Sequence, residues 1–415
     1  MNQKTTKQER NWILYDVGNS AYTMLVTTII PIYFNFIASE QGLTDVQYLA
    51  YWGYAASVVT LIVAILGPIV GTLTDNKGFK KPIFMISLIV GSVCCVALGF
   101  TGHWLLFLII FIISKIGYAS SLIFYDSMLP DVTTPDRMDK VSTSGYAWGY
   151  IGSCIPFVAC LGVVLGKDAL GISMEMGMTI AFLITALWWV LMTVPLLRTY
   201  QQKYYVECQK NAVAETFKRL GKTLANARKH SKIFWFLIAF FFYIDGVYTI
   251  IDMATSYGQA LGLNSSGLLL ALLVTQIVAF PCAIIFGHFA QKFESSKLIT
   301  VCILAYLGIA VFAIFLTNIV EFWVLAVLVG MFQGGIQSLS RSYFTKIIPP
   351  EQSGEFFGIY DICGKGAAFL GTTLVGIVSQ LTGSINKGIS VLSLLFLLGL
   401  FFFRVAASSA KKDQG

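Results

Sequence analysis

Apolar residues run in long stretches from one end of the chain to the other, separated by mostly short polar segments. Each stretch reaches about 20 residues, the length that an α-helix needs to cross ~30 Å of hydrocarbon. Inside lipid a segment must satisfy its own backbone polar groups, so these stretches predict transmembrane helices. We expect twelve, near residues 12–38, 47–73, 82–101, 104–129, 141–166, 173–196, 232–257, 265–286, 297–317, 321–346, 355–382 and 387–407.

One polar stretch, at 197–231, is longer than the other connections and divides the helices into two sets of six. We therefore expect an N-terminal six-helix bundle over 1–196, a cytoplasmic basic linker, and a C-terminal six-helix bundle over 232–415. Around Phe217 in the linker, apolar and basic side chains alternate, which predicts an amphipathic helix lying on the anionic inner leaflet. A binding site for a regulatory partner is the alternative.

Composition and charge agree with a membrane protein. The chain is 56% hydrophobic and 12% charged, where a soluble protein has roughly a quarter of its residues charged. Lys and Arg favour cytoplasmic loops, and an inside N-terminus places most of them inside, among them Lys4, Lys7, Arg10, Lys77, Lys80, Lys81, Arg137, Lys140, Arg341, Lys346, Lys411 and Lys412. The outside loops then hold only Lys167 and Lys387. We expect both termini in the cytoplasm. Lipid topology explains the net charge of +7, so no nucleic-acid partner is expected.

Residues that bind metals or nucleotides are scarce. The eight cysteines form no CxxC pair, there are three histidines, and no GxxxxGK[ST] phosphate loop occurs. We expect no metal, no cofactor, no catalytic residue and no enzyme activity. The expected partners are a small-molecule substrate and membrane lipid, with the chain acting as a monomer.

The two predicted halves resemble each other. The loop 71–81 after the second helix has a counterpart at 287–297, which begins 216 residues later. At an offset of 219, Pro130, Gly145 and Gly152 match Pro349, Gly364 and Gly371. A near-constant offset indicates a duplicated unit, and such repeats in transporters pack around a central site near the midplane.

The segment 71–81 resembles the loop motif G-x-x-x-D-x-x-G-x-K/R-K/R of the major facilitator superfamily. Asp75 can cap a helix N-terminus or pair with a base, and Gly78 permits a tight turn. The resemblance implies that this loop locks the cytoplasmic side of the two halves together. In the second copy Gln291 replaces the Asp and Glu294 replaces the second Gly, so we expect that half of the lock to be weak.

Further segments narrow the resemblance to the vacuole-effluxer-like family of that superfamily. They are Tyr15–Tyr22, Phe124–Pro130, Gly145–Gly152, Tyr243–Gly246, Gln337–Ser342 and Glu355–Tyr360. The resemblance covers nearly the whole chain and implies an all-α membrane protein of the major facilitator fold, with twelve transmembrane helices in two pseudo-symmetric six-helix bundles. It also implies transport, and amino acids as a substrate class, because fungal members export amino acids from the vacuole.

Charged residues inside the predicted helices need a reason, because each costs roughly 2.5–3.5 kcal/mol at the bilayer centre. On the seventh helix, Asp245, Tyr248 and Asp252 share one face at i, i+3 and i+7. Asp245 lies near mid-depth, where a carboxylate can carry a coupling proton. The alternative is a structural carboxylate paired across helices.

Lys115 and Tyr118 share one face of the fourth helix, and Lys115 is too deep to reach either surface easily. A buried ammonium needs a carboxylate partner. A substrate such as an amino acid would supply one, and a permanent ion pair with Asp245 or Asp16 is the alternative.

Other internal polar residues suggest gates. Asp361 and Lys365, at i and i+4 on the eleventh helix, are expected to form a local ion pair that responds to opening of the cytoplasmic side. Asp16 and Asn19 lie near the cytoplasmic end of the first helix, where they can act at a gate. Asp126, at the cytoplasmic end of the fourth helix, is either a gate residue or an ordinary interfacial residue.

On the tenth helix Gln333, Gln337 and Arg341 step by four, a stripe that faces protein or a cavity and not lipid. The glutamines contact either substrate or a neighbouring helix, and Arg341 is expected to order the nearby loop. We assign substrate binding or proton coupling to Asp16, Asn19, Lys115, Tyr118, Asp245, Tyr248, Asp252, Gln333, Gln337 and Lys365. We assign gating to Gly71, Asp75, Gly78, Asp126, Arg341 and Asp361.

Together these features predict a secondary transporter of a small polar solute in the plasma membrane, coupled to protons. A lipid or lipid-headgroup translocase on the same fold is the main alternative. A membrane-embedded enzyme would need a His- or Asp-rich constellation at one face, and a sensor would need a signalling domain larger than the linker.

Overall fold

The computed structural model describes residues 4–207, 231–260 and 265–412, and these residues are almost wholly helical. The six long helices of the first half are α1 (Lys7–Glu40), α2 (Asp45–Thr74), α3 (Lys80–Ala97), α4 (Trp104–Ser127), α6 (Met138–Leu165) and α8 (Met174–Thr199). Those of the second half are α10 (Ser231–Ala260), α11 (Ser265–Phe289), α12 (Ser295–Ile314), α13 (Ile319–Ile347), α14 (Ser353–Thr382) and α15 (Ile385–Lys412). The short helices are η1 (Leu98–Phe100), α5 (Leu129–Val132), α7 (Lys167–Leu170) and η3 (Pro350–Gln352).

Each predicted span corresponds to one long helix. In the described part of the chain, eleven helices are long and apolar enough to cross a membrane, and α14 contributes the shorter apolar piece Leu370–Thr382. Polar capping residues explain why some helices extend beyond the predicted apolar runs. At α1 the Thr6 side chain accepts from the Glu9 N–H while the Glu9 carboxylate accepts from the Thr6 N–H, so the helix begins before its apolar run.

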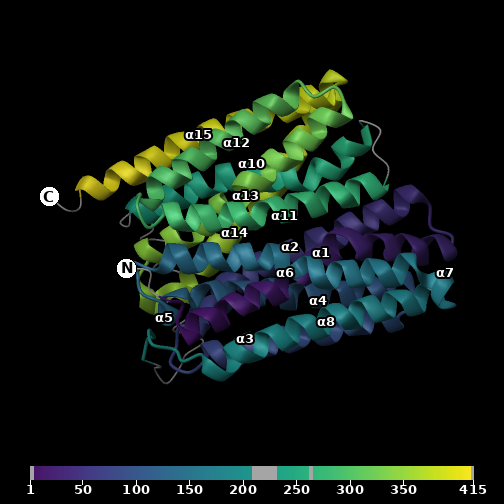
Figure 1. Ribbon diagram of the computed structural model, residues 1–415, viewed down its shortest axis with the longest axis horizontal. Coiled ribbons are helices and arrows are strands. Elements are labelled where there is room, and N and C mark those ends of the chain that lie inside the picture. The colour runs from purple at the N-terminus through teal and green to yellow at the C-terminus, as the bar shows by residue number, and fades with distance from the viewer. Residues whose placement is uncertain (1–3, 208–230, 261–264, 413–415) are drawn as a thin grey trace.

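The long helices run side by side, and α1 begins at the same end of the molecule at which α15 ends (Figure 1). We call this the terminal end; α7 lies at the opposite end. The even number of long helices accounts for this arrangement. Which end faces the cytoplasm stays a prediction from the loop charges.

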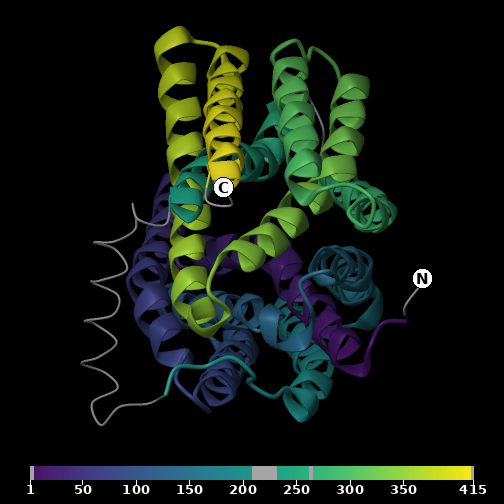
Figure 2. The ribbon, with the colours of Figure 1, turned by 90° about the vertical axis from the view of Figure 1, so that its left-hand side faces the viewer.

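Two groups of helices are visible when the molecule is viewed from the terminal end (Figure 2). In the first, α1 packs on α6 and α8, and α3 on α4; in the second, α10 packs on α14 and α15, and α11 on α13. Between the groups, α2 contacts α14, and α6 contacts α11 and α13. We call the two groups the N half and the C half.

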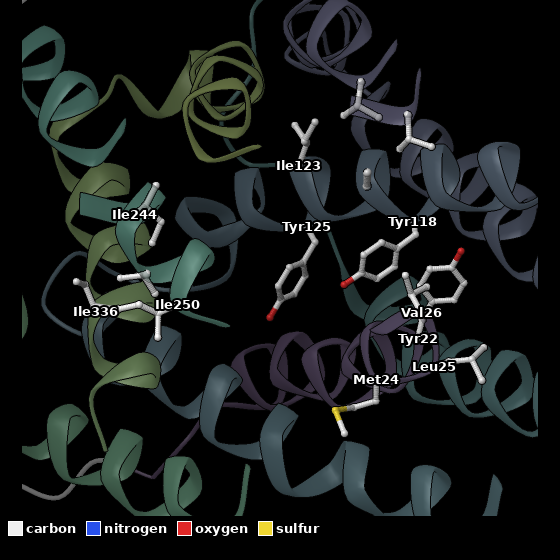
Figure 3. Close-up of a cluster of buried hydrophobic side chains, with 14 of the residues drawn as sticks. Tyr22, Met24, Leu25, Val26, Tyr118, Ile123, Tyr125, Ile244, Ile250 and Ile336 are labelled. Carbon is white, nitrogen blue, oxygen red and sulfur yellow. The ribbon is translucent and has the colours of Figure 1, made fainter. Parts of the chain in front are cut away.

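Aromatic side chains fill much of the interior of the N half. The rings of Tyr22 on α1 and Tyr118 on α4 lie against each other (Figure 3), and their centroids are 4.6 Å apart. The Tyr22 hydroxyl is 2.8 Å from Ser114 Oγ, and the Tyr118 hydroxyl bonds to Thr23. Because these hydroxyls are satisfied within the half, α1 and α4 form a rigid wall for the space between the two halves.

Candidate functional site

A cavity of about 330 Å³ lies between the halves. Its walls come from α1, α4 and α6 on one side and from α10, α11, α13 and α14 on the other. Eight of the residues assigned from the sequence line it, namely Asp16, Asn19, Tyr118, Asp126, Tyr248, Gln337, Arg341 and Asp361. The predicted polar stripes therefore converge on one space that both halves share.

Arg341 of α13 crosses the interface between the halves beside this cavity. Its Nη1 is 2.9 Å from Asp126 Oδ1 and its Nη2 is 3.2 Å from Asp16 Oδ2, so one guanidinium pairs with two carboxylates of the N half. Nε donates to Ser142 Oγ at 2.9 Å, and Nη2 donates to the Ser142 carbonyl at 3.0 Å. We call these four residues the gate cluster. Arg341 is only 2% exposed, and these contacts offset the desolvation cost of burying its charge.

Aromatic rings enclose the gate cluster. The guanidinium carbon of Arg341 lies 4.7 Å from the ring centre of Trp12 and 4.5 Å from that of Tyr146. A Cβ atom at Gly145 would lie 3.1 Å from Arg341 Nη2 and would overlap the Asp16 carboxylate. The sequence predicted that Arg341 orders a loop, but its described partners lie within transmembrane helices.

The loop 71–81 joins the halves at the terminal end. Asp75, which is fully buried, accepts from the Gly354 N–H at 2.7 Å and from the Glu355 N–H at 3.0 Å. Of the two roles that the sequence allowed for Asp75, a helix cap or a pair with a base, the structure shows the cap, and the helix is α14 of the opposite half. The α2 and α14 backbones meet so closely that a Cβ at Gly71 would overlap the Gly354 carbonyl, while Gly78 has φ +79° as its turn requires. We call this contact the lock.

A buried lysine, whose position the sequence did not reveal, reinforces the lock. Lys80 is fully buried; its Nζ donates to Ser353 Oγ at 2.9 Å and lies 3.6 Å from Asp131. The Tyr200 hydroxyl donates to Asp131 at 2.6 Å. Burial, together with the Asp131 charge, raises the pKa of Tyr200 well above its usual value, so this hydroxyl keeps its proton and remains a donor.

The second half of the lock centres on Asp139, which lies outside the degraded motif, and takes only Ser295 from the described motif segment 287–297. Asp139 at the start of α6 accepts from Ser342 Oγ at 2.6 Å and from Ser295 Oγ at 2.7 Å, and it pairs with Lys346. We expected a weak contact because Gln291 replaces the motif's Asp. Sequence reasoning missed Asp139 because an acidic residue in the first turn of a helix is common at exposed ends.

Asp245 and Asp252, predicted to share a face with Tyr248, do not join it in lining the cavity. Asp245 is fully buried and accepts from the Gly371 N–H at 2.9 Å and from Thr249 Oγ at 3.3 Å. Its Oδ2 has no partner among the described residues. Asp252 is exposed.

The two ion pairs proposed for Lys115 are wrong. Asp16 pairs with Arg341, and Asp245 bonds to α14 and to its own helix. The Lys115 ammonium instead lies 5.1 Å from the ring centre of Tyr118 and interacts electrostatically with Asp252 across the halves. The sequence could not identify this partner because it depends on which helices become neighbours.

Three sequence predictions remain, for Gln333, for Lys365 and for the linker. Gln333 lines a smaller, mostly apolar pocket between α10, α11 and α13. Lys365 belongs to α14, but its side chain is outside the described part of the structure, so its pair with Asp361 stays a prediction. The linker prediction around Phe217 also falls outside the described residues.

Two groups of membrane helices around a shared central cavity, joined at one end by a lock of this form, define a transporter of the major facilitator superfamily. Comparison with known proteins agrees. The chain belongs to the vacuole effluxer Atg22-like family, whose sequence pattern matches residues 4–415.

Relatives at two levels of similarity support this assignment. The chain is 42% identical over 418 residues to an uncharacterised MFS-type transporter, YxiO, of Bacillus subtilis, covering all of this chain and 98% of the relative. It is 23% identical to autophagy-related protein 22 of Coccidioides immitis, covering 85% of this chain and 72% of the relative. The protein is therefore a multi-pass membrane protein and a secondary transporter, and it is not an enzyme.

Solved structures show the same fold. The human organic anion transporter MFSD10 superposes with a TM-score of 0.73 at 14% identity, covering 96% of this chain and all of that chain. The transporter FucP in its outward conformation superposes with a TM-score of 0.72 at 14% identity, covering 96% of this chain and 97% of that chain.

Proposed function

We propose that the protein moves a small polar solute across the plasma membrane by alternating access, coupled to protons, with the cavity as the substrate site. One observation carries this proposal: the cavity is lined by both halves, and the contacts that join the halves at the terminal end include ion pairs and hydrogen bonds. Amino acids, the class implied by the family resemblance, are the first candidates for the solute.

The gate cluster and the lock must separate for the cavity to open toward the terminal end. In alternating access, the two halves rock about the central site. The Arg341 ion pairs, the Asp75 cap of α14 and the Asp139 contacts would then break together. Because each partner is a polar group that water can solvate, opening replaces these contacts with hydration.

Asp245 is the proposed proton carrier. It is buried, it receives neutral hydrogen bonds, and no described cation pairs with it. An isolated buried carboxylate is costly, and binding a proton relieves that cost. Protonation would also weaken the bond from the Gly371 N–H. The same helix, α14, carries Gly354 of the lock and Asp361 of the cavity. A change in the bond between Asp245 and α14 can therefore affect both the lock and the cavity.

An Asp245→Asn variant tests the coupling. We expect proton-driven transport in proteoliposomes to fall at least about tenfold, while exchange of labelled for unlabelled solute survives, because exchange needs no net proton movement. Asp168→Asn, a change of an exposed residue at the opposite end, is the matched control. Unchanged pH-dependent transport in Asp245→Asn would contradict the proposed role.

A ligand screen tests the substrate site. Purified protein is heated with amino acids, peptides, sugars, nucleosides and lipid-headgroup analogues, and bound ligand stabilises it by about 2.7 kcal/mol at 100 times its Kd. A true cavity ligand should lose its stabilising effect in Gln337→Leu, which removes a polar lining group. Stabilisation by headgroup analogues alone would favour the lipid translocase instead.

A further inference from the structure

The cavity has more acidic than basic lining side chains. Its described lining includes three carboxylates, on Asp16, Asp126 and Asp361, and one guanidinium, on Arg341. Asp361 is left out of the charge count because we expect Lys365 to neutralise it. The net charge is therefore counted for the gate cluster alone. Within it, two carboxylates face one guanidinium, at 3.2 and 2.9 Å, which leaves one net negative charge beside the cavity.

Lys115, the cation predicted to meet a substrate carboxylate, is not among the described lining residues of the cavity, and the single guanidinium that does line it has little capacity for an anionic substrate. Arginine has five N–H donors, and the contacts to Asp16, Asp126 and Ser142 occupy four of them in this structure. The remaining donor cannot form the paired contact by which arginine recognises a carboxylate. A substrate carboxylate would also approach two carboxylates that are already in place.

Aromatic rings supply much of the remaining wall. They are Tyr118, Tyr146, Tyr150, Tyr248, Tyr360, Phe240 and Phe357. The rings of Phe240 and Tyr360 stack with centroids 4.0 Å apart, which fixes an aromatic surface between α10 and α14. Ring faces attract cations because the π system carries negative charge on its faces. Tyr146 already interacts in this way with Arg341.

We propose that the transported solute is a compact organic cation with one net positive charge, such as a protonated amine or a quaternary ammonium. The positive group would lie among the rings, close to the excess negative charge of the gate cluster. A volume of about 330 Å³ restricts the solute to a small molecule. This inference rests on the proposed transport function. It replaces amino acids, the class implied by the family resemblance, with organic cations as the first candidates for the solute.

Titration calorimetry with matched probes tests the charge requirement. Choline is compared with dimethylbutanol, its uncharged carbon isostere. Choline is also compared with betaine, a zwitterion that keeps the same trimethylammonium group. Protonated butylamine is compared with uncharged butanol. We expect each cation to bind at least about tenfold more tightly than its uncharged isostere, and betaine to bind more weakly than choline. Equal or tighter binding of the isosteres or of betaine overturns the inference, as does failure of both cations to bind.

Two variants locate the interaction. Asp126→Asn removes a carboxylate of the gate cluster without changing its shape, and Tyr248→Leu removes a lining ring. Each should weaken cation binding by about three- to tenfold and leave the isosteres unaffected. Glu40→Gln, a change of an exposed carboxylate outside the cavity lining, should change nothing. Wild-type affinity for choline and butylamine in both variants overturns the inference. If amino acids or sugars bind and exchange while the cations do not, the transport function stands and only the substrate class is wrong.

Discussion

At the scale of residues, the gate cluster depends on one arginine. Lysine carries the same charge, but only arginine provides a planar fork of donors that can serve two carboxylates and Ser142 together. The buried guanidinium and the two carboxylates need one another, because removing one partner leaves an uncompensated charge inside the protein.

Arg341→Gln should therefore lower the free energy of unfolding by about 3–5 kcal/mol, measured by denaturant titration in bicelles. Adding Asp16→Asn and Asp126→Asn should recover part of this loss, because the carboxylates are then no longer charged and unpaired. A loss below about 1 kcal/mol in the single variant would show that the cluster contributes little to stability.

Sequence reasoning selected three residues of the gate cluster but not the contacts between them, and their gating role stays a prediction. Asp16 and Asp126 were selected because charge inside an apolar run is costly, and Arg341 because it continues the polar stripe of Gln333 and Gln337. Asp139 and Lys80 lie near helix ends, where charge is ordinary, so nothing in the sequence marked them as buried. For Lys115 the alternative of an ion pair with Asp245 or Asp16 was wrong, because pairing is set by contacts between helices that are distant in sequence. The substrate carboxylate stays a prediction.

At the scale of elements, the approach of α2 to α14 determines the lock. Gly71 and Gly354 allow the two backbones to touch, which places Asp75 at the N-terminus of α14. The motif in the sequence predicted the turn at Gly78 and allowed the cap as one of two roles for Asp75. It did not predict that Lys80 would be fully buried between the halves.

Gly71→Ala tests this packing. The added Cβ overlaps the Gly354 carbonyl, so we expect α2 and α14 to separate, transport to fall at least about tenfold, and stability to drop by about 1–3 kcal/mol. Gly53→Ala on the same helix is the matched control, because its Cβ would have nothing within 4 Å. The control should be neutral or slightly stabilising, since Ala favours a helix over Gly by up to about 1 kcal/mol. Equal effects of the two changes in transport and thermal-unfolding assays would refute the packing argument.

At the scale of the whole molecule, the apolar runs and the repeat offset predicted twelve helices and an internal duplication. The division at 196 and 231 and the cytoplasmic termini stay predictions. Sequence reasoning did not predict which end of the cavity is closed, because both states of a rocking transporter are built from the same helices. In this structure the closing contacts lie at the terminal end, where α6 meets α11 and α2 meets α14.

Alternating access requires the terminal end to open, and a reversible disulfide between the halves tests this requirement. In a background with the eight native cysteines replaced, Thr143→Cys and Gly287→Cys join α6 to α11, where the Thr143 Cβ lies 3.3 Å from a Cβ built at Gly287. Val17→Cys and Gly152→Cys place a bond at the same Cβ separation of 3.3 Å inside the N half, as the matched control.

The measurement is solute exchange in proteoliposomes before oxidation, after oxidation and after reduction, with the cross-linked fraction determined on the same samples. We predict that the bond between the halves abolishes exchange in proportion to the cross-linked fraction and that reduction restores it. The bond within the N half should leave exchange unchanged. Full exchange by protein whose halves are cross-linked at Thr143→Cys and Gly287→Cys would contradict the account.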